Sequence, residues 1–155
     1  GQKIKAQFAF ALSTDPKYLI LDEPTANFDP DFKQDLLNVI MQFMESGKKS
    51  VIIASHILDE LDRIADYLIY LDKGELVYSG DIESFRDKYR IISGETYKVK
   101  LLKQEDIIHV EDRKYGTKAL VVNHGYSKYD GALTVTVPTL EEFMYHYSKR
   151  GESVI

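Results

Sequence analysis

The spacing of hydrophobic residues in the first third of this chain predicts an α/β order. Apolar residues recur every three or four positions over residues 3–13, as on one face of a helix. The short, uninterrupted apolar run at 18–21 is typical of a buried parallel strand. A second helix is expected to begin at Pro30 with Asp29 as its N-cap, and a second parallel strand covers residues 50–54.

The middle of the chain predicts further alternation of helices and strands. We expect Ser55 to cap a helix that carries apolar positions between residues 57 and 65. Strands are predicted at 67–71 and 75–78, joined by a turn at 72–74. A helix is predicted at 82–89, with Asp81 as its expected N-cap.

The pattern changes after about residue 91, so we place a domain boundary between residues 92 and 93. Strand alternation is expected at 96–101, 118–122 and 133–137. A last helix begins after Thr139, which forms a capping box with Glu142. The prediction is an α/β domain over 1–92, followed by a small β-rich accessory domain over 93–155 that ends in a helix.

Polar side chains follow both predicted parallel strands. Asp22 and Glu23 come directly after the first strand, and His56 follows the second. Parallel strands bring such residues to one edge of a sheet, where a carboxylate pair suits a Mg²⁺-nucleotide site. Each signal alone has an ordinary explanation, because Asp-Glu-Pro also forms turns and an isolated histidine usually caps a loop.

The order of these signals resembles the ABC-transporter ATPase family. Gly1-Gln2 matches the end of the glycine-rich signature, and residues 19–24 match the Walker B strand. Residues 26–29 match the D-loop, and Ser55-His56 matches the switch histidine. The resemblance covers the first half of the chain closely and implies the C-terminal part of a P-loop NTPase domain.

The resemblance implies a catalytic role for three residues at the predicted sheet edge. Asp22 would help to hold Mg²⁺, directly or through water. Glu23 would be the general base that orients and polarises the attacking water. His56 would contact the γ-phosphate and stabilise the charge that develops there. The implied cofactors are ATP and Mg²⁺.

The resemblance also implies a dimer and a membrane partner. Asp29 would cross the interface between two nucleotide-binding domains and help to organise the opposite site. Gly1 and Gln2 would belong to the signature that closes on ATP held by the other domain. A separate transmembrane permease is the expected second partner.

The chain contains no Gly-x-x-x-x-Gly-Lys-Ser/Thr sequence, which would supply the phosphate-binding nest and lysine. The Gln loop expected upstream of the signature is absent too. We therefore expect the chain to be the C-terminal part of a longer protein. We also predict that these 155 residues alone bind Mg-ATP weakly or not at all and have no ATPase activity.

Composition narrows the class of protein. The chain is 44% hydrophobic and 29% charged, as globular domains are, and its lack of cysteine excludes a disulfide framework. A net charge of −5 argues against general nucleic-acid binding. No apolar run is long enough to span a bilayer, so we expect a cytoplasmic protein held at the inner face of the membrane by its partner. We expect His109, His124 and His146 to be surface residues.

Three functions are consistent with these residues. The favoured one is the ATP-hydrolysing subunit of an ABC transporter, and the segment 138–143 resembles the end of bacterial drug, antibiotic and bacteriocin exporter ATPases. A non-transport ATPase with the same motor is the second. The third is a catalytically silent regulatory module, against which the presence of both Glu23 and His56 argues.

Overall fold

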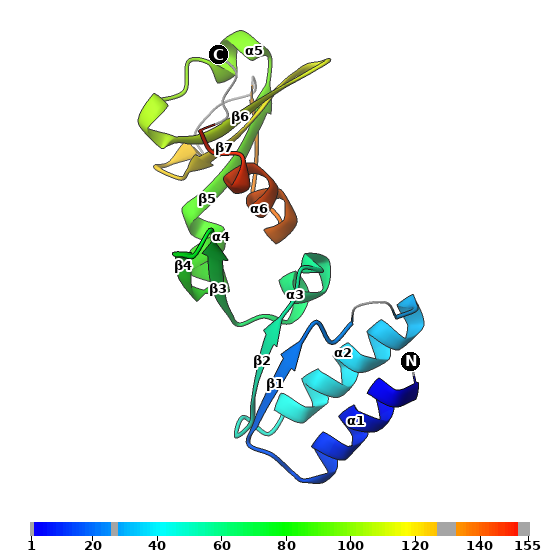
Figure 1. Cartoon of the computed structure of the whole chain (residues 1–155). Helices are drawn as coiled ribbons and strands as arrows, with labels where there is room; N and C mark the ends of the chain where they lie inside the picture. The colour runs from blue at the N-terminus through cyan, green and yellow to red at the C-terminus, as the bar shows by residue number, and fades with distance from the viewer. Residues whose placement is uncertain (1, 26–27, 127–132, 152–155) are drawn as a thin grey trace. The chain divides into compact units, whose positions relative to one another are not determined.

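The computed structural model describes residues 2–25, 28–126 and 133–151. The chain divides into two compact units, Gly1–Ile64 and Ala65–Ile155 (Figure 1). The boundary predicted between residues 92 and 93 falls within a strand of the second unit, and the division into a catalytic and an accessory domain stays a prediction. The expected α/β class is confirmed, with a parallel strand pair in the first unit and antiparallel sheets in the second.

The first unit contains a parallel strand pair and three helices. Strand β1 (Tyr18–Asp22) pairs with β2 (Ser50–Ala54) in a register that places Asp22 opposite Ala54. Figure 1 shows α1 and α2 on the same side of this pair. The helices are α1 (Gln2–Ser13), α2 (Pro30–Met44) and α3 (Leu58–Ile64).

Only one face of the β1–β2 pair is covered by the described residues. Leu19 is 5% exposed, whereas Ile20 and Ile52, which are paired across the strands, are 74% and 60% exposed. Tyr18 on the same face is 72% exposed. Parallel strands are normally buried on both faces, so this alternation leaves an apolar surface uncovered in the first unit.

The second unit begins with an antiparallel hairpin, β3 (Tyr67–Asp72) and β4 (Glu75–Asp81), followed by helix α4 (Ile82–Lys88). Asp81 is the N-cap of α4 as predicted, and its side chain accepts a 2.7 Å hydrogen bond from the backbone N–H of Ser84.

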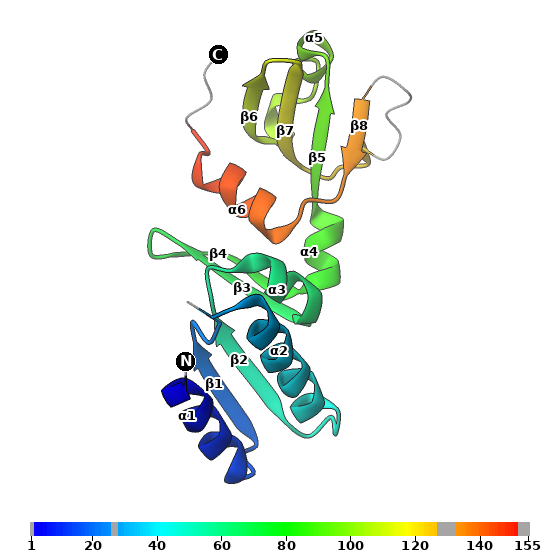
Figure 2. The same cartoon turned by 90° about the vertical axis from the view of Figure 1, so that its right-hand side faces the viewer.

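A four-stranded antiparallel sheet forms the rest of the second unit, in the order β6–β7–β5–β8 (Figure 2). Helix α6 begins after Thr139, whose capping box with Glu142 is confirmed. The remaining elements are β5 (Tyr89–Gly94), α5 (Thr96–Val99), the 3₁₀ turn η1 (Gln104–Asp106), β6 (Ile107–Arg113), β7 (Gly116–Val122), β8 (Leu133–Thr136) and α6 (Leu140–Ser148).

The strand predicted at 96–101 is wrong, because this segment begins with the helical turn α5. Val99 is fully buried against the sheet, whereas Tyr97 and Leu101 are 61% and 81% exposed, so the three do not share a face. The backbone N–H of Val99 donates to the carbonyl of Glu95, and Glu95 pairs with Lys98 at 2.6 Å. Tertiary burial of Val99 and this local pair outweigh the strand alternation.

Two hydrophobic layers lie on opposite faces of the four-stranded sheet. One joins α5 and the loop after it to β5 and β7 through a cluster of Ile92, Val99, Leu102, Ala119, Val121 and Tyr126. The other packs α6 against the sheet and extends to the hairpin through aromatic contacts among Tyr70, Tyr78, Phe85, Tyr89, Phe143 and Tyr147.

Candidate functional site

The two parallel strands bring Glu23 and His56 together at their carboxyl ends. Glu23 follows the last residue of β1, and its backbone N–H donates a 2.8 Å hydrogen bond to the carbonyl of Ala54 at the end of β2. This bond extends the strand pairing by one residue. His56 lies two residues beyond Ala54, so both side chains emerge from the same edge of the pair.

Glu23 and His56 interact directly. Nδ1 of His56 lies 2.8 Å from Oε2 of Glu23, and the backbone N–H of His56 donates to Oε1 at 3.2 Å. The hydroxyl of Ser55 donates to Oε2 at 3.4 Å. The carboxylate is therefore held by three donors, all from the segment that follows β2.

The backbone of Glu23 adopts the left-handed conformation with φ of 47°, which is uncommon for a residue other than glycine. Such a conformation costs free energy and persists where surrounding contacts impose it. Here the bond from its N–H to Ala54 and the donors on its carboxylate fix both ends of the residue.

The hydrogen bond from His56 holds the pKa of the Glu23 carboxyl below its ordinary value of 4.5, against an opposing effect of desolvation. The Glu23 side chain is 38% exposed and that of His56 is 74% exposed. The pair is thus an ionised carboxylate beside an imidazole, and both side chains reach solvent.

Asp22 is exposed at the end of β1, one residue before Glu23. One or two carboxylates together with substrate phosphates and water are the usual ligands of Mg²⁺ at nucleotide sites. The described residues contain no group of three or more His, Cys, Asp or Glu residues that could hold a metal by themselves. The exposed carboxylate of Asp22 has the chemistry of one such ligand, and its role at a metal stays a prediction.

Asp29 is the N-cap of α2, as predicted. Its Oδ1 accepts a 2.9 Å hydrogen bond from the backbone N–H of Phe32, and this bond holds the pKa of Asp29 below its ordinary value. Its role across a dimer interface stays a prediction. Gly1 lies outside the described residues, as do Ala26 and Asn27 of the predicted D-loop, and Gln2 is the first residue of α1.

Ser55 has a different role from the one predicted. Helix α3 begins at Leu58, so Ser55 does not cap it; its hydroxyl instead accepts a 3.0 Å hydrogen bond from the backbone N–H of Ile57 and donates to Glu23. The contact of Ser55 with the Glu23 carboxylate was not predicted. Its position between β2 and His56 was the available signal.

No family model matches the chain, but curated proteins match about half of it. A putative ABC transporter ATP-binding protein of Mycoplasma pneumoniae is 41% identical over 80 residues, which are 52% of this chain and 24% of the relative. The energy-coupling factor transporter ATP-binding protein EcfA2 of Caldanaerobacter subterraneus is 40% identical over 92 residues, 59% of this chain and 32% of the relative. EcfA2 of Streptococcus pyogenes is 35% identical over 80 residues.

The chain spans about a quarter to a third of the length of these relatives, between 24% and 32%. Their names bear out the family resemblance and state no direction of transport, so the exporter type stays a prediction. Among the described residues, no helix is both long and apolar enough to cross a membrane. Over about half of its length, this chain is homologous to the ATP-binding proteins of ABC transporters.

Proposed function

We propose that this chain is the C-terminal part of the ATP-binding subunit of an ABC transporter and carries its hydrolytic base. The observation that supports the proposal most strongly is the 2.8 Å contact between Glu23 and His56, which come from two parallel strands 33 residues apart. A degenerate site would have no reason to retain this pairing. The contact therefore favours an active ATPase over a silent regulatory module.

Glu23 is the proposed general base. Its carboxylate is ionised and partly exposed, so it can orient a water molecule and accept its proton. Three donors and a fixed backbone restrict its rotation, which reduces the cost of orienting the water. Bound Mg-ATP would supply the phosphoryl group that the water attacks.

His56 is the proposed contact to the terminal phosphate. A carboxylate oxygen only accepts hydrogen bonds, so the hydrogen in the contact with Glu23 lies on Nδ1 of His56. The other ring nitrogen, Nε2, is left for a ligand, and a protonated ring would present an N–H there to an anionic oxygen. Asp22 would contribute a carboxylate ligand to Mg²⁺.

The uncovered apolar face of β1–β2 supports the proposal that nucleotide binding needs further protein. Ile20 and Ile52 are exposed where a larger parallel sheet would bury them, and the sequence lacks the phosphate-binding glycine-lysine loop. We propose that the missing part of the nucleotide-binding domain covers this face in the longer protein. Its binding of ATP and Mg²⁺ would then be a property of the assembled domain.

The proposed partners are a second nucleotide-binding domain, with which Gly1, Gln2 and Asp29 would close on ATP, and a transmembrane permease. That partner would hold the protein at the cytoplasmic face of the membrane. Export is the direction we propose, on the resemblance of residues 138–143 to exporter ATPases. A non-transport ATPase is the alternative that the same site allows.

The test uses the full-length protein with Glu23→Gln, which removes the negative charge and keeps the shape of the side chain. We expect steady-state ATP turnover to fall by about 10²–10⁴-fold, the usual contribution of a general base. Nucleotide-dependent dimerisation should persist. Glu45→Gln, an equal change at an exposed residue after α2, is the matched control and should leave turnover unchanged. Wild-type turnover in Glu23→Gln would remove Glu23 from the mechanism.

A further inference from the structure

Helix α6 joins two parts of the second unit. Through Phe143 and Tyr147 it contacts Tyr70 in strand β3 of the hairpin, with ring centroids 5.6 and 5.8 Å apart. Arg150, just beyond the helix, pairs with Asp72 at 2.5 Å. Phe143 also contacts Tyr89 of β5, and His146 contacts His109 of β6, so the position of this helix is shared by the hairpin and the sheet.

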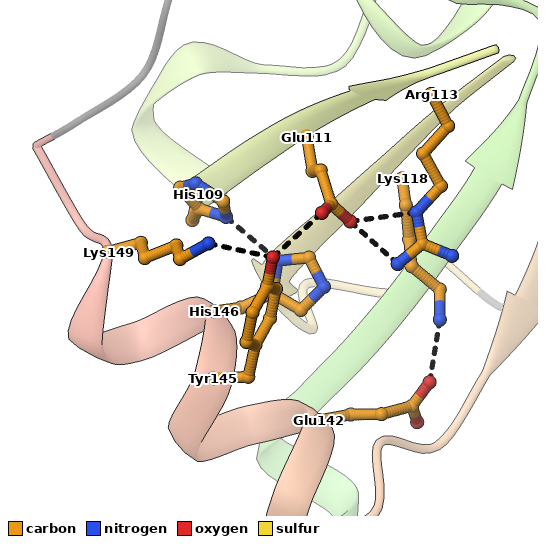
Figure 3. Close-up of polar contacts among 8 residues, drawn as sticks. All are labelled: His109, Glu111, Arg113, Lys118, Glu142, Tyr145, His146 and Lys149. Carbon is orange, nitrogen blue, oxygen red and sulfur yellow. Dashed lines mark hydrogen bonds and ion pairs between the residues drawn. The ribbon is translucent and has the colours of Figure 1, made fainter.

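A buried histidine pair lies between α6 and the sheet (Figure 3). Nδ1 of His146 in α6 is 2.8 Å from Nδ1 of His109 in β6, and the two residues are 1% and 5% exposed. The expectation that both are surface residues is therefore wrong. Each histidine contacts the other across 37 residues of sequence, so its burial depends on a distant segment of the chain.

Two imidazoles can share a hydrogen bond only when one of the facing nitrogens carries a proton and the other does not. A first added proton can sit on an outer nitrogen and keeps the bond, but it places a charge in a buried site. A second proton puts two N–H groups against each other and removes the bond. The contact between α6 and β6 therefore weakens in two steps as protons are added.

Charged residues surround the pair from each element packed against it. Strand β6 contributes Glu111 and Arg113, which pair at 2.6 Å, and Tyr145 of α6 donates to Glu111 at 2.8 Å. Strand β7 contributes Lys118, which pairs with Glu142 of α6 at 2.6 Å. Lys149 donates to the hydroxyl of Tyr145 at 2.7 Å.

The cations in this group oppose a further positive charge. Burial is the largest cause that lowers the pKa of His146 from 6.5 to about 4, and His109, Lys118 and Arg113 add to it, whereas Glu111 acts in the opposite direction. Protons can reach His146 from solvent, because it lines a pocket of about 240 Å³. The residues that line this pocket are Arg113, Lys118, Glu141, Glu142, Tyr145 and His146.

We propose that the His109–His146 pair makes the docking of α6 sensitive to protons, so that acidification releases α6 from the sheet and weakens its contacts to the hairpin. The same helix carries Phe143 and Tyr147, which contact Tyr70, and it leads to Arg150, which pairs with Asp72. Protonation at the sheet is thereby coupled to the hairpin through one rigid element.

The test is amide hydrogen exchange of the 155-residue chain, followed by NMR at pH 7.5 and 5.5 and corrected for intrinsic exchange rates. The pKa of His146 is about 4 when α6 is docked and has its ordinary value of 6.5 when α6 is released. The ratio of released to docked helix should therefore be about tenfold higher at pH 5.5 than at pH 7.5. We expect protection of the Met144 and Tyr147 amides to fall by this factor. The Leu120 amide in β7 should keep its protection.

The variant His109→Leu/His146→Leu removes both titrating rings, and its α6 amides should show no such pH dependence. His124→Gln is the control, because His124 is a 63% exposed histidine paired with Asp106 and lies outside α6 and β6. It should keep the tenfold change. If the double variant does not fold, the wild-type imidazole ¹⁵N shifts decide, since the ring of His146 must stay neutral at pH 5.5 in the docked helix.

Three results of the exchange experiment would overturn the proposal. They are equal protection of the α6 amides at the two pH values, an equal loss of amide protection in α6 and β7 at pH 5.5, and a double variant whose α6 amides keep the wild-type pH dependence. Imidazole shifts that report charged rings in the docked helix at pH 5.5 would also overturn it. A tenfold loss confined to α6, and absent from the double variant, would support it.

Discussion

Phe143 provides a sharp test of how the second unit is held together. The side chain is 1% exposed at the centre of the contact between α6 and the aromatic residues of the hairpin, α4 and β5. Its ring lies within 4.6–5.6 Å, centroid to centroid, of Tyr70, Phe85, Tyr89 and Tyr147. The variant Phe143→Ala removes this ring and leaves a cavity among four aromatic partners.

We expect the variant to lower the free energy of unfolding of the second unit by about 3–5 kcal/mol, the usual range for a buried Phe→Ala change. The ring contacts with the four neighbours, which are edge-on to Tyr70 and Phe85, tilted to Tyr89 and stacked on Tyr147, place the value toward the upper end. With an m-value of about 2 kcal/mol per molar urea, the transition midpoint should fall by about 2 M.

The assay is urea unfolding followed by tyrosine fluorescence. The chain has no tryptophan, and every tyrosine except Tyr18 lies in the second unit, so the signal reports that unit. Leu101→Ala is the control, because the Leu101 side chain is 81% exposed in the same unit and its loss should change stability by less than about 0.5 kcal/mol. A cost below about 1 kcal/mol for Phe143→Ala, or equal costs for both variants, would show that the Phe143 ring does not hold the second unit together.

Three further predictions concern the cap of α2, the buried histidine and nucleotide binding. Asp29→Ala should destabilise the first unit by about 0.5–2 kcal/mol, because the hydrogen bond from the Phe32 N–H is lost. Urea unfolding measures this change, with Asp35→Ala as the control at an exposed residue of the same helix. Equal effects of the two variants would contradict the prediction. The folded state keeps His146 neutral to about pH 4, so the free energy of unfolding should fall as the pH drops from 6.5 to 4, by up to about 1.4 kcal/mol per pH unit. It should stay level above about pH 7.5. A profile from thermal unfolding that is level over the whole range would contradict this prediction. Calorimetric titration of the 155-residue chain with Mg-ATP should show no micromolar binding, and such binding would contradict the proposed need for further protein.

Local signals in the sequence were sufficient for most of the first unit. The apolar runs at β1 and β2 and the cap at Asp29 act within a few residues, so their structures follow from neighbouring side chains. The same is true of the cap at Asp81 in the second unit. Glu23 and His56 were predictable as neighbours because parallel strands bring their carboxyl ends to one edge.

Features that depend on distant contacts were missed in the second unit. Helix α5 forms because Val99 is buried against β5 and β7, which outweighs the alternation at 96–101. Strands β5 and β6 were not predicted. The partners of β5 lie far along the chain, since Tyr89 pairs with Val122 and Gly94 with Leu133, whereas β6 pairs with the next strand, β7. The burial of His109 and His146 has the same origin, since neither residue carries a local signal for the other.

We propose that Glu23 and His56 act as one hydrolytic site. The most direct measurement is the ATP turnover of the full-length protein carrying Glu23→Gln, His56→Gln, or both. Residues that act as a unit have non-additive effects, so the double variant should be no slower than the slower single variant by more than a few-fold. Multiplied losses in the double variant, or wild-type turnover in either single variant, would contradict the account.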